Sequence, residues 1–256
     1  MNKNYPPATL LYTHTRLLHS NIVDDDYELS IWLPPGYESS DQTYPTLYVL
    51  DAPFLFGSTI WLSWIQHLDA DVPEMIVVGI GKQMKNLDNW WSIRWRDYSL
   101  VEMPDEPGSG HGDSYLKFLG EELIPFIDAN YRTQPDDRIL WGESMSGSYT
   151  VSVMFSQTNL FNRYIASAPS FHDRGHTLFD FENALASASF ASEVQLFVCV
   201  GELDKTYGPG AQTFMKALSE KKISNLKYQA MIFEGLGHTA AAIPGFVYGI
   251  EAVFKM

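Results

Sequence analysis

Uninterrupted apolar runs, separated by longer segments of mixed character, set the hydrophobic pattern of this 256-residue chain. Residues 46–50, 75–79 and 194–200 form such runs, as expected of parallel strands buried on both faces. Residues 27–32 instead alternate polar and apolar positions, which predicts a half-exposed strand. Further strands are predicted at 138–141, 164–165 and 226–233. Helices are predicted at 58–70, from Ser114 onward with a kink at Pro125, at 148–154, at 212–221 and after Pro244.

Strands that alternate with helices predict an α/β fold, with a mostly parallel central sheet and helices on both of its faces. The pattern contains no Pro/Gly/Ser-rich linker and no internal repeat, so residues 1–256 are interpreted as one domain. Ligands of such sheets bind at the carboxyl ends of the strands. Small or polar residues stand at these ends, namely Asp51, Gly79, Ser144, Ser167, Gly201 and Gly235.

Residues 142–147 read Gly-Glu-Ser-Met-Ser-Gly and lie between a predicted strand and a predicted helix. A strand that turns sharply into a helix at Gly-x-Ser is the nucleophile elbow of α/β-hydrolases, in which small neighbours let the two backbones pass. Ser144 is therefore the candidate nucleophile. Ser146 occupies the last position of the motif, where glycine is usual, and it is the next serine to consider.

A serine hydroxyl needs a histidine to accept its proton, and the histidine needs a carboxylate to hold its tautomer. In α/β-hydrolases these residues follow one another in the order Ser, acid, His. Asp204 follows the predicted strand at 194–200 and is the preferred acid, with Glu202 as the alternative. His238 is the only histidine after that acid and lies in a glycine-rich loop. The predicted catalytic residues are Ser144, Asp204 and His238.

Several ordered segments carry a resemblance that extends over nearly the whole chain. They are residues 33–37 (Leu-Pro-Pro-Gly-Tyr), 44–51, 77–80, 94–98 (Arg-Trp-Arg-Asp-Tyr), 142–147, 167–170 (Ser-Ala-Pro-Ser), 201–204 (Gly-Glu-Leu-Asp) and 237–238. Together they resemble the putative-esterase branch of the α/β-hydrolase superfamily, which contains esterase-D-like enzymes, trilactone siderophore esterases and mycolyltransferases.

The resemblance implies a serine hydrolase that cleaves carboxylic esters through a Ser-His-Asp triad and an acyl-enzyme intermediate. An acyltransferase with the same triad, a siderophore trilactone esterase and a thioesterase are alternatives within the enzyme class. A ligand-binding protein on a hydrolase fold is the alternative outside it, and the complete triad order disfavours that alternative.

The oxyanion hole of such an enzyme requires two backbone N–H donors. Met145, directly after the nucleophile, is the first expected donor. By resemblance, the second falls at Pro53, which has no N–H, and Asp51 is followed by Ala52 where the family usually has glycine. We expect a shifted loop in which Phe54 donates. Donation by Ala52, or a hole with a single donor, remains open.

The candidate substrate-binding residues are Trp90, Trp91, Arg94, Trp95 and His172. The tryptophans fall in a segment predicted to be loop-rich, where they either wall an acyl pocket or pack beneath the loop. The arginines of residues 94–97 either bind an anionic end of the substrate or pin the loop through an internal ion pair, which is favoured for at least one of them.

The formal net charge of −14 argues against nucleic acid and anionic membrane surfaces as partners, and leaves a small-molecule ester as the expected one. Cys199, the single cysteine, lies in an apolar run and is expected to be a buried small hydrophobe. One cysteine and no apolar leader-like segment favour a cytoplasmic location. No metal, cofactor or membrane span is expected, and the oligomeric state is open.

Overall fold

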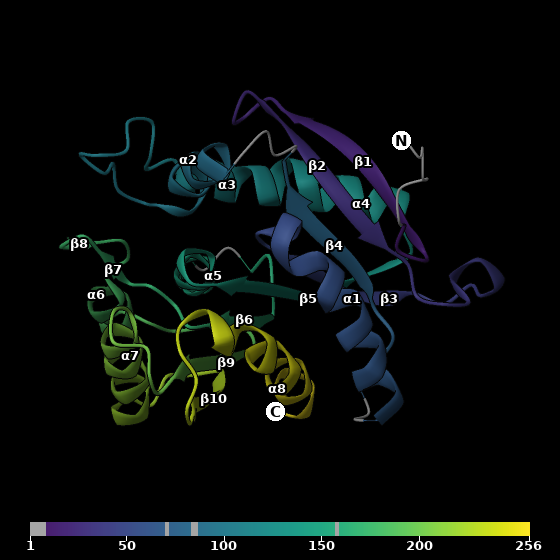
Figure 1. The fold of residues 1–256 in the computed structure, drawn as a ribbon. Helices are drawn as coiled ribbons and strands as arrows, with labels where there is room; N and C mark the ends of the chain where they lie inside the picture. Colours follow the sequence, from purple (N-terminus) through teal and green to yellow (C-terminus); the bar gives the residue numbers. More distant parts are fainter. Residues whose placement is uncertain (1–8, 70–71, 83–86, 157–158) are drawn as a thin grey trace, which may run out of the picture.

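A central eight-stranded sheet organises the protein in the computed structural model, which describes residues 9–69, 72–82, 87–156 and 159–256 (Figure 1). Its order is β1-β2-β4-β3-β5-β6-β9-β10, and β7 and β8 form a separate hairpin. The strands are β1 (Thr13–Ser20), β2 (Asp25–Trp32), β3 (Tyr44–Val49), β4 (Ile76–Gly81), β5 (Thr133–Glu143), β6 (Arg163–Ser167), β7 (His172–Asp173), β8 (His176–Thr177), β9 (Val194–Gly201) and β10 (Leu226–Phe233).

Strand direction divides this sheet into two parts. β1 pairs with β2, and β2 with β4, in antiparallel fashion, whereas all pairings from β4 to β10 are parallel. Every residue of β3 and β9 is buried, as the uninterrupted apolar runs predict for strands covered on both faces. β1 escaped the sequence pattern because it is an edge strand with largely exposed side chains.

Helices cover both faces of the sheet, which confirms the predicted α/β architecture. α1 (Ala52–Asp69) and α8 (Ala242–Lys255) pack together over one face. The other face carries α2 (Leu87–Tyr98), α3 (Gly112–Phe118), η2 (Leu119–Leu123), α4 (Ile124–Asn130), α5 (Met145–Phe155), α6 (Phe181–Ala186) and α7 (Gly208–Glu220). Two short turns, η1 (Tyr37–Ser39) and η3 (Thr239–Ala241), complete the described elements.

Two local predictions were wrong in detail. Residues 87–98 were expected to be loop-rich but form α2, and α3 begins at Gly112 rather than with Ser114 as its cap. The expected distortion at Pro125 takes the form of a π-helical turn at η2, because proline has no N–H to continue the regular ladder. No helix in the described ranges is both long and apolar enough to cross a membrane.

Candidate active site

Ser144 sits at the sharp turn between β5 and α5, with φ 61° and ψ −119°. A non-glycine residue rarely adopts positive φ, so the surrounding packing must hold it there. A Cβ on Gly142 would lie 2.3 Å from the Ser146 carbonyl oxygen, and one on Gly147 would lie 2.8 Å from that of Ser167. Glycines at these two positions therefore allow the close approach that leaves Ser144 at the carboxyl edge of the sheet.

His238 lies between Ser144 and Asp204 at hydrogen-bond distances. Its Nε2 is 2.8 Å from Ser144 Oγ, and its Nδ1 is 2.6 Å from Asp204 Oδ2. Asp204 follows β9 and His238 follows β10, two neighbouring parallel strands whose loops meet at the same edge. Gly201 allows this meeting, since a Cβ there would lie 2.4 Å from the Leu236 carbonyl oxygen.

The two candidate acids have different partners. The backbone N–H groups of Thr206 and Tyr207 donate to Asp204 Oδ1. Burial alone would raise the pKa of Asp204, but the N–H groups of Tyr207 and Gly208 and the His238 imidazole hold it below its ordinary value. Glu202 instead accepts a hydrogen bond from the Gly235 N–H at 2.9 Å. Asp204, the preferred acid, is therefore the carboxylate that faces His238.

Ser146 is fully buried behind the elbow and does not face the histidine. Its Oγ lies 2.7 Å from Asp51 Oδ2 and 2.8 Å from the Glu143 carbonyl oxygen, and it accepts the Glu143 N–H at 2.9 Å. Arg94 donates from Nε and Nη2 to the Asp51 carboxylate and from Nη2 to the Glu143 carbonyl oxygen. Asp51, Arg94 and Ser146 thus form one buried network beneath the nucleophile.

The structure argues against Phe54 as the second oxyanion donor. Its N–H donates to the Asp51 carbonyl oxygen at 3.0 Å, inside the first turn of α1. Ala52, the first residue of α1, donates its N–H to no acceptor among the described residues. Met145, the first residue of α5, likewise has a free N–H. The first N–H groups of a helix have no partner within the helix, and they carry its positive end.

A cavity of about 530 Å³ adjoins the histidine and includes two of the predicted tryptophans. Trp91 and Trp95 line it together with Tyr207, whose ring centroid is 4.7 Å from that of His238. Arg174 also lines it, lies over the Trp95 ring at 4.7 Å and pairs with Glu106 and Asp173. The cavity thus combines aromatic faces with one paired guanidinium, and Tyr207 links it to the proposed catalytic base.

The other predicted substrate-binding residues lie elsewhere. Arg94 is only 3% exposed, stacks on Trp90 and pins Asp51, as the ion-pair interpretation expected. Trp90 packs against Phe54 with ring centroids 4.4 Å apart. His172 is exposed and lines a separate cavity of about 700 Å³ near α6.

Sequence reasoning missed several groups that stand at the site. Ser170 Oγ lies 3.2 Å from Ser144 Oγ, and the only signal for it was its place in the Ser-Ala-Pro-Ser segment. Tyr207 and Glu143 gave no signal of their own, because their contacts with His238 join segments far apart in the chain.

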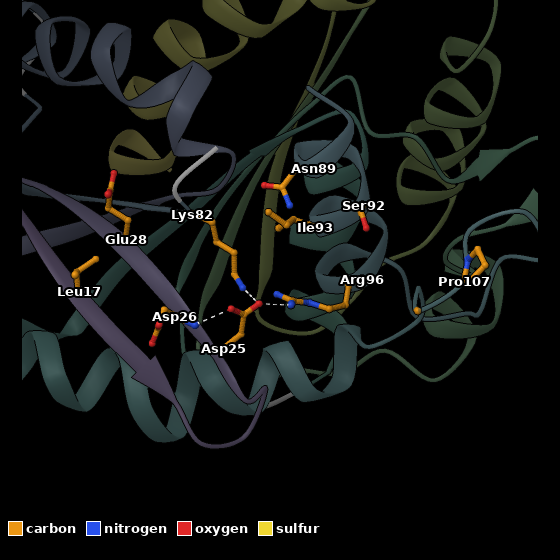
Figure 2. A pocket seen from close by; sticks show the side chains of 11 residues that line it. Leu17, Asp25, Asp26, Glu28, Lys82, Asn89, Ser92, Ile93, Arg96 and Pro107 are labelled. Carbon is orange, nitrogen blue, oxygen red and sulfur yellow. Dashed lines mark hydrogen bonds and ion pairs between the residues drawn. The ribbon is translucent and has the colours of Figure 1, made fainter. Parts of the chain in front are cut away.

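A further cavity of about 530 Å³ lies between β2 and α2 and is lined by none of the predicted catalytic residues (Figure 2). Three of its charged residues are paired with one another, since Asp25 lies against both Lys82 and Arg96. Across the part of the chain that the structure describes, no three His, Cys, Asp or Glu side chains gather as a metal site would require. Cys199 is fully buried, as predicted.

Comparisons with known proteins show the family and the fold of the chain. A family model described as putative esterase matches residues 20–235. The chain is 24% identical over 249 residues to ferri-bacillibactin esterase BesA of Bacillus subtilis (strain 168), covering 90% of this chain and 85% of the relative. The BES protein from Bacillus cereus has a TM-score of 0.86 at 21% identity, covering 99% of this chain and 98% of that one. An IroE-like serine hydrolase from Shewanella oneidensis has a TM-score of 0.83 at 24% identity, covering 95% and 80%. These structures share the expected α/β-hydrolase fold.

Proposed function

The chain belongs to the putative esterase family, and we propose that it hydrolyses carboxylic esters as a single-domain enzyme through Ser144, His238 and Asp204. The observation that carries this proposal is the continuous chain of contacts from Asp204 through His238 to Ser144, at 2.6 and 2.8 Å. It ends at a serine held in a strained turn at the carboxyl edge of the sheet.

In this mechanism Ser144 Oγ attacks the acyl carbon while His238 Nε2 accepts its proton. The same proton passes from Nε2 to the leaving alcohol, and an acyl-enzyme forms on Ser144. Water then attacks the acyl carbon, again with His238 as base, and acid product and free Ser144 result. Asp204 holds the Nδ1–H tautomer and stabilises the imidazolium.

Met145 and Ala52 supply the oxyanion donors in this proposal, because both N–H groups stand free at the first residue of a helix. Replacement of Ala52 by proline removes one donor and is expected to lower kcat about a hundredfold to a thousandfold. Phe54→Pro, which removes an N–H bonded inside α1, is the matched control. A larger kcat loss in Phe54→Pro than in Ala52→Pro would return the donor role to Phe54.

The substrate class that fits the cavity best is an ester with aromatic groups, such as a trilactone siderophore. Trp91 and Trp95 offer aromatic faces in a cavity that Tyr207 links to His238, and Arg174, paired with Glu106 and Asp173, lines the same cavity. A relative named ferri-bacillibactin esterase supports the same class. A panel of p-nitrophenyl esters of increasing chain length, a trilactone siderophore and an acyl-CoA tests it, with the highest kcat/KM expected for the siderophore.

Ser144→Ala tests the proposed nucleophile. It is expected to lower kcat for ester hydrolysis about a millionfold, as loss of the nucleophile does in comparable triads. Ser219→Ala, on the exposed side of α7, is the control for the same chemical change. Retention of more than a few per cent of activity in a folded Ser144→Ala protein would exclude Ser144.

Asp204→Asn and Glu202→Gln separate the two candidate acids. Asp204→Asn is expected to lower kcat about ten-thousandfold, since an amide at this position favours the wrong histidine tautomer. Glu202→Gln leaves the contact between Asp204 and His238 in place, and its effect should be small. The opposite ranking of the two variants in kcat would move the acid to Glu202.

A further inference from the structure

Glu143, the residue before Ser144, places a buried carboxyl oxygen beside the triad histidine. Its Oε1 lies 3.9 Å from His238 Nε2, the same nitrogen that is 2.8 Å from Ser144 Oγ. A separation of 3.9 Å is too long for a hydrogen bond but short for a charge interaction. Within the described residues, Oε1 is shielded from water and has no hydrogen-bond partner. A buried polar atom without a partner calls for an explanation.

The backbone of Glu143 is held on both sides, so its carboxyl cannot readily move away. The N–H donates to Ser146 Oγ, and the carbonyl oxygen accepts from Ser146 Oγ and Arg94 Nη2. Glu143 is also in register with Ser167 of β6 inside the sheet. The elbow therefore fixes the backbone from which the carboxyl extends, one residue before the proposed nucleophile, and the side chain is only 11% exposed.

The charged groups that face Glu143 do not neutralise a carboxylate there. Arg94 is already bound to Asp51 through Nε and Nη2, and Asp204 is already paired with His238. Burial raises the pKa of Glu143 to about 8. The nearby Arg94 lowers this pKa, whereas Asp51 and Asp204 raise it. On β9, the buried thiol of Cys199 also has a raised pKa, of about 12, chiefly through burial. The site thus favours an uncharged Glu143 at neutral pH.

We propose that Glu143 is a positioning residue that acts as a neutral acid, so that His238 Nε2 exchanges its proton only with Ser144 and the leaving alcohol. This role rests on the proposed esterase function. A neutral carboxyl at 3.9 Å exerts little attraction on the imidazolium that forms when Ser144 attacks. Asp204 binds Nδ1 and leaves the Nε2 proton free for transfer, whereas an ionised Glu143 would attract the Nε2 proton itself and compete for it with the leaving alkoxide. Transfer of the Nε2 proton to the leaving alkoxide then slows, and the overall reaction stays the same.

The test is the pH dependence of kcat/KM for an alkyl ester, measured by pH-stat from pH 5 to 10. In the wild type, kcat/KM is expected to fall about tenfold or more between pH 7 and pH 10 as Glu143 ionises. Glu143→Gln, a neutral isostere, should keep kcat/KM within about threefold of the wild type at pH 7 and abolish that alkaline fall. A p-nitrophenyl ester, whose leaving group needs no proton, should show a smaller fall in the wild type.

Glu121→Gln is the matched control, because it makes the same substitution at an exposed position and should leave the alkaline fall in place. An active Glu143→Gln enzyme with an unchanged alkaline fall would overturn the role of Glu143 alone. An equal loss of activity of Glu143→Gln at every pH would also overturn this role, because it would indicate a purely structural effect. A wild type inactive on all esters would instead overturn the proposed function.

A second measurement reads the protonation of Glu143 without any substrate. A carboxyl whose folded-state pKa is raised binds more protons in the folded than in the unfolded state between about pH 4.5 and pH 8. The Tm of the wild type relative to Glu143→Gln should therefore fall as pH rises through that window and level off above it. A Tm difference that stays constant with pH contradicts a neutral Glu143.

Discussion

Two charged clusters flank α2, and the helix contributes one arginine to each. Arg94 reaches Asp51 under the elbow, where the side chains of the pair are 3% and 4% exposed. Arg96, two residues later, reaches Asp25, where the side chains are 23% and 38% exposed and line a cavity of about 530 Å³ (Figure 2). A step of two residues turns a side chain by roughly 200° around a helix, so the two arginines serve different regions.

Burial decides what each cluster contributes. Asp51 binds Arg94 and Ser146 in a closed network, in which Arg94 also donates to the Glu143 carbonyl oxygen. Asp51 directly precedes Ala52 in the chain. Asp25 lies between Lys82 and Arg96 at the wall of an open cavity, where Asp25 and Arg96 are 38% and 23% exposed and Lys82 Nζ is shielded from water. Similar acid–arginine pairs on one helix can therefore differ in burial, so that one lies in a closed network beneath the proposed nucleophile and the other at the wall of an open cavity.

The largest expected effect on stability comes from Asp51→Asn. It leaves Arg94 as a buried, uncompensated charge, and should lower the free energy of unfolding by about 3–5 kcal/mol. Because Asp51 also precedes the first N–H of α1, kcat should fall up to about a hundredfold, the size of one misplaced oxyanion donor. Urea denaturation measures the loss of stability, and ester hydrolysis measures the loss of kcat. A loss of unfolding free energy no larger than that of Asp25→Asn would show that the two clusters do not differ.

Ser146→Ala is expected to have an intermediate effect. It deprives Asp51 of one donor and the Glu143 N–H of its acceptor. Because buried polar groups are then left without a partner, the free energy of unfolding should fall by about 1–3 kcal/mol. Hydrolytic activity should remain within about tenfold of the wild type, since Ser146 does not face His238. A kcat loss as large as that of Ser144→Ala would instead make Ser146 the nucleophile.

Asp25→Asn is the matched change in the second cluster. Asp25 is 38% exposed and Arg96 keeps Asp97 as a partner, but Lys82 Nζ is shielded from water and loses its counter-charge. The free energy of unfolding should therefore fall by less than the roughly 3–5 kcal/mol expected for Asp51→Asn. Because none of the proposed catalytic residues lines that cavity, kcat/KM should be unchanged. A clear loss of kcat/KM would show that the second cavity takes part in catalysis.

The smallest expected effect is the response of the two variants to salt. At 1 M salt the Debye length is about 3 Å, so the stability cost of Asp25→Asn should shrink more than that of Asp51→Asn. Urea denaturation of both variants at low and high NaCl measures this difference. Equal salt sensitivity would mean that the Asp51 cluster is open to water.

Local patterns in the sequence were sufficient for the parts of the site that depend on neighbours along the chain. The pattern of Gly142, Ser144 and Gly147 predicts the elbow, because the close packing of strand and helix there tolerates only small residues. Buried runs reveal β3 and β9, and Asp204 and His238 follow neighbouring parallel strands, so their order along the chain predicts their meeting.

Features that depend on contacts between segments far apart in the chain were decided only by the tertiary structure. β1 lacks an apolar pattern because it lies at the edge of the sheet, and α2 was mistaken for a loop because its aromatic residues gave no clear helical period.

The role of Ser146, the pairing of Arg94 with Asp51 and the choice of Ala52 over Phe54 all turn on contacts across the fold. Hydrophobic periodicity records which face of an element is buried, but it carries no information on which buried polar groups meet. That is settled by the packing that brings them together, because a buried donor or charge is stable only beside its partner.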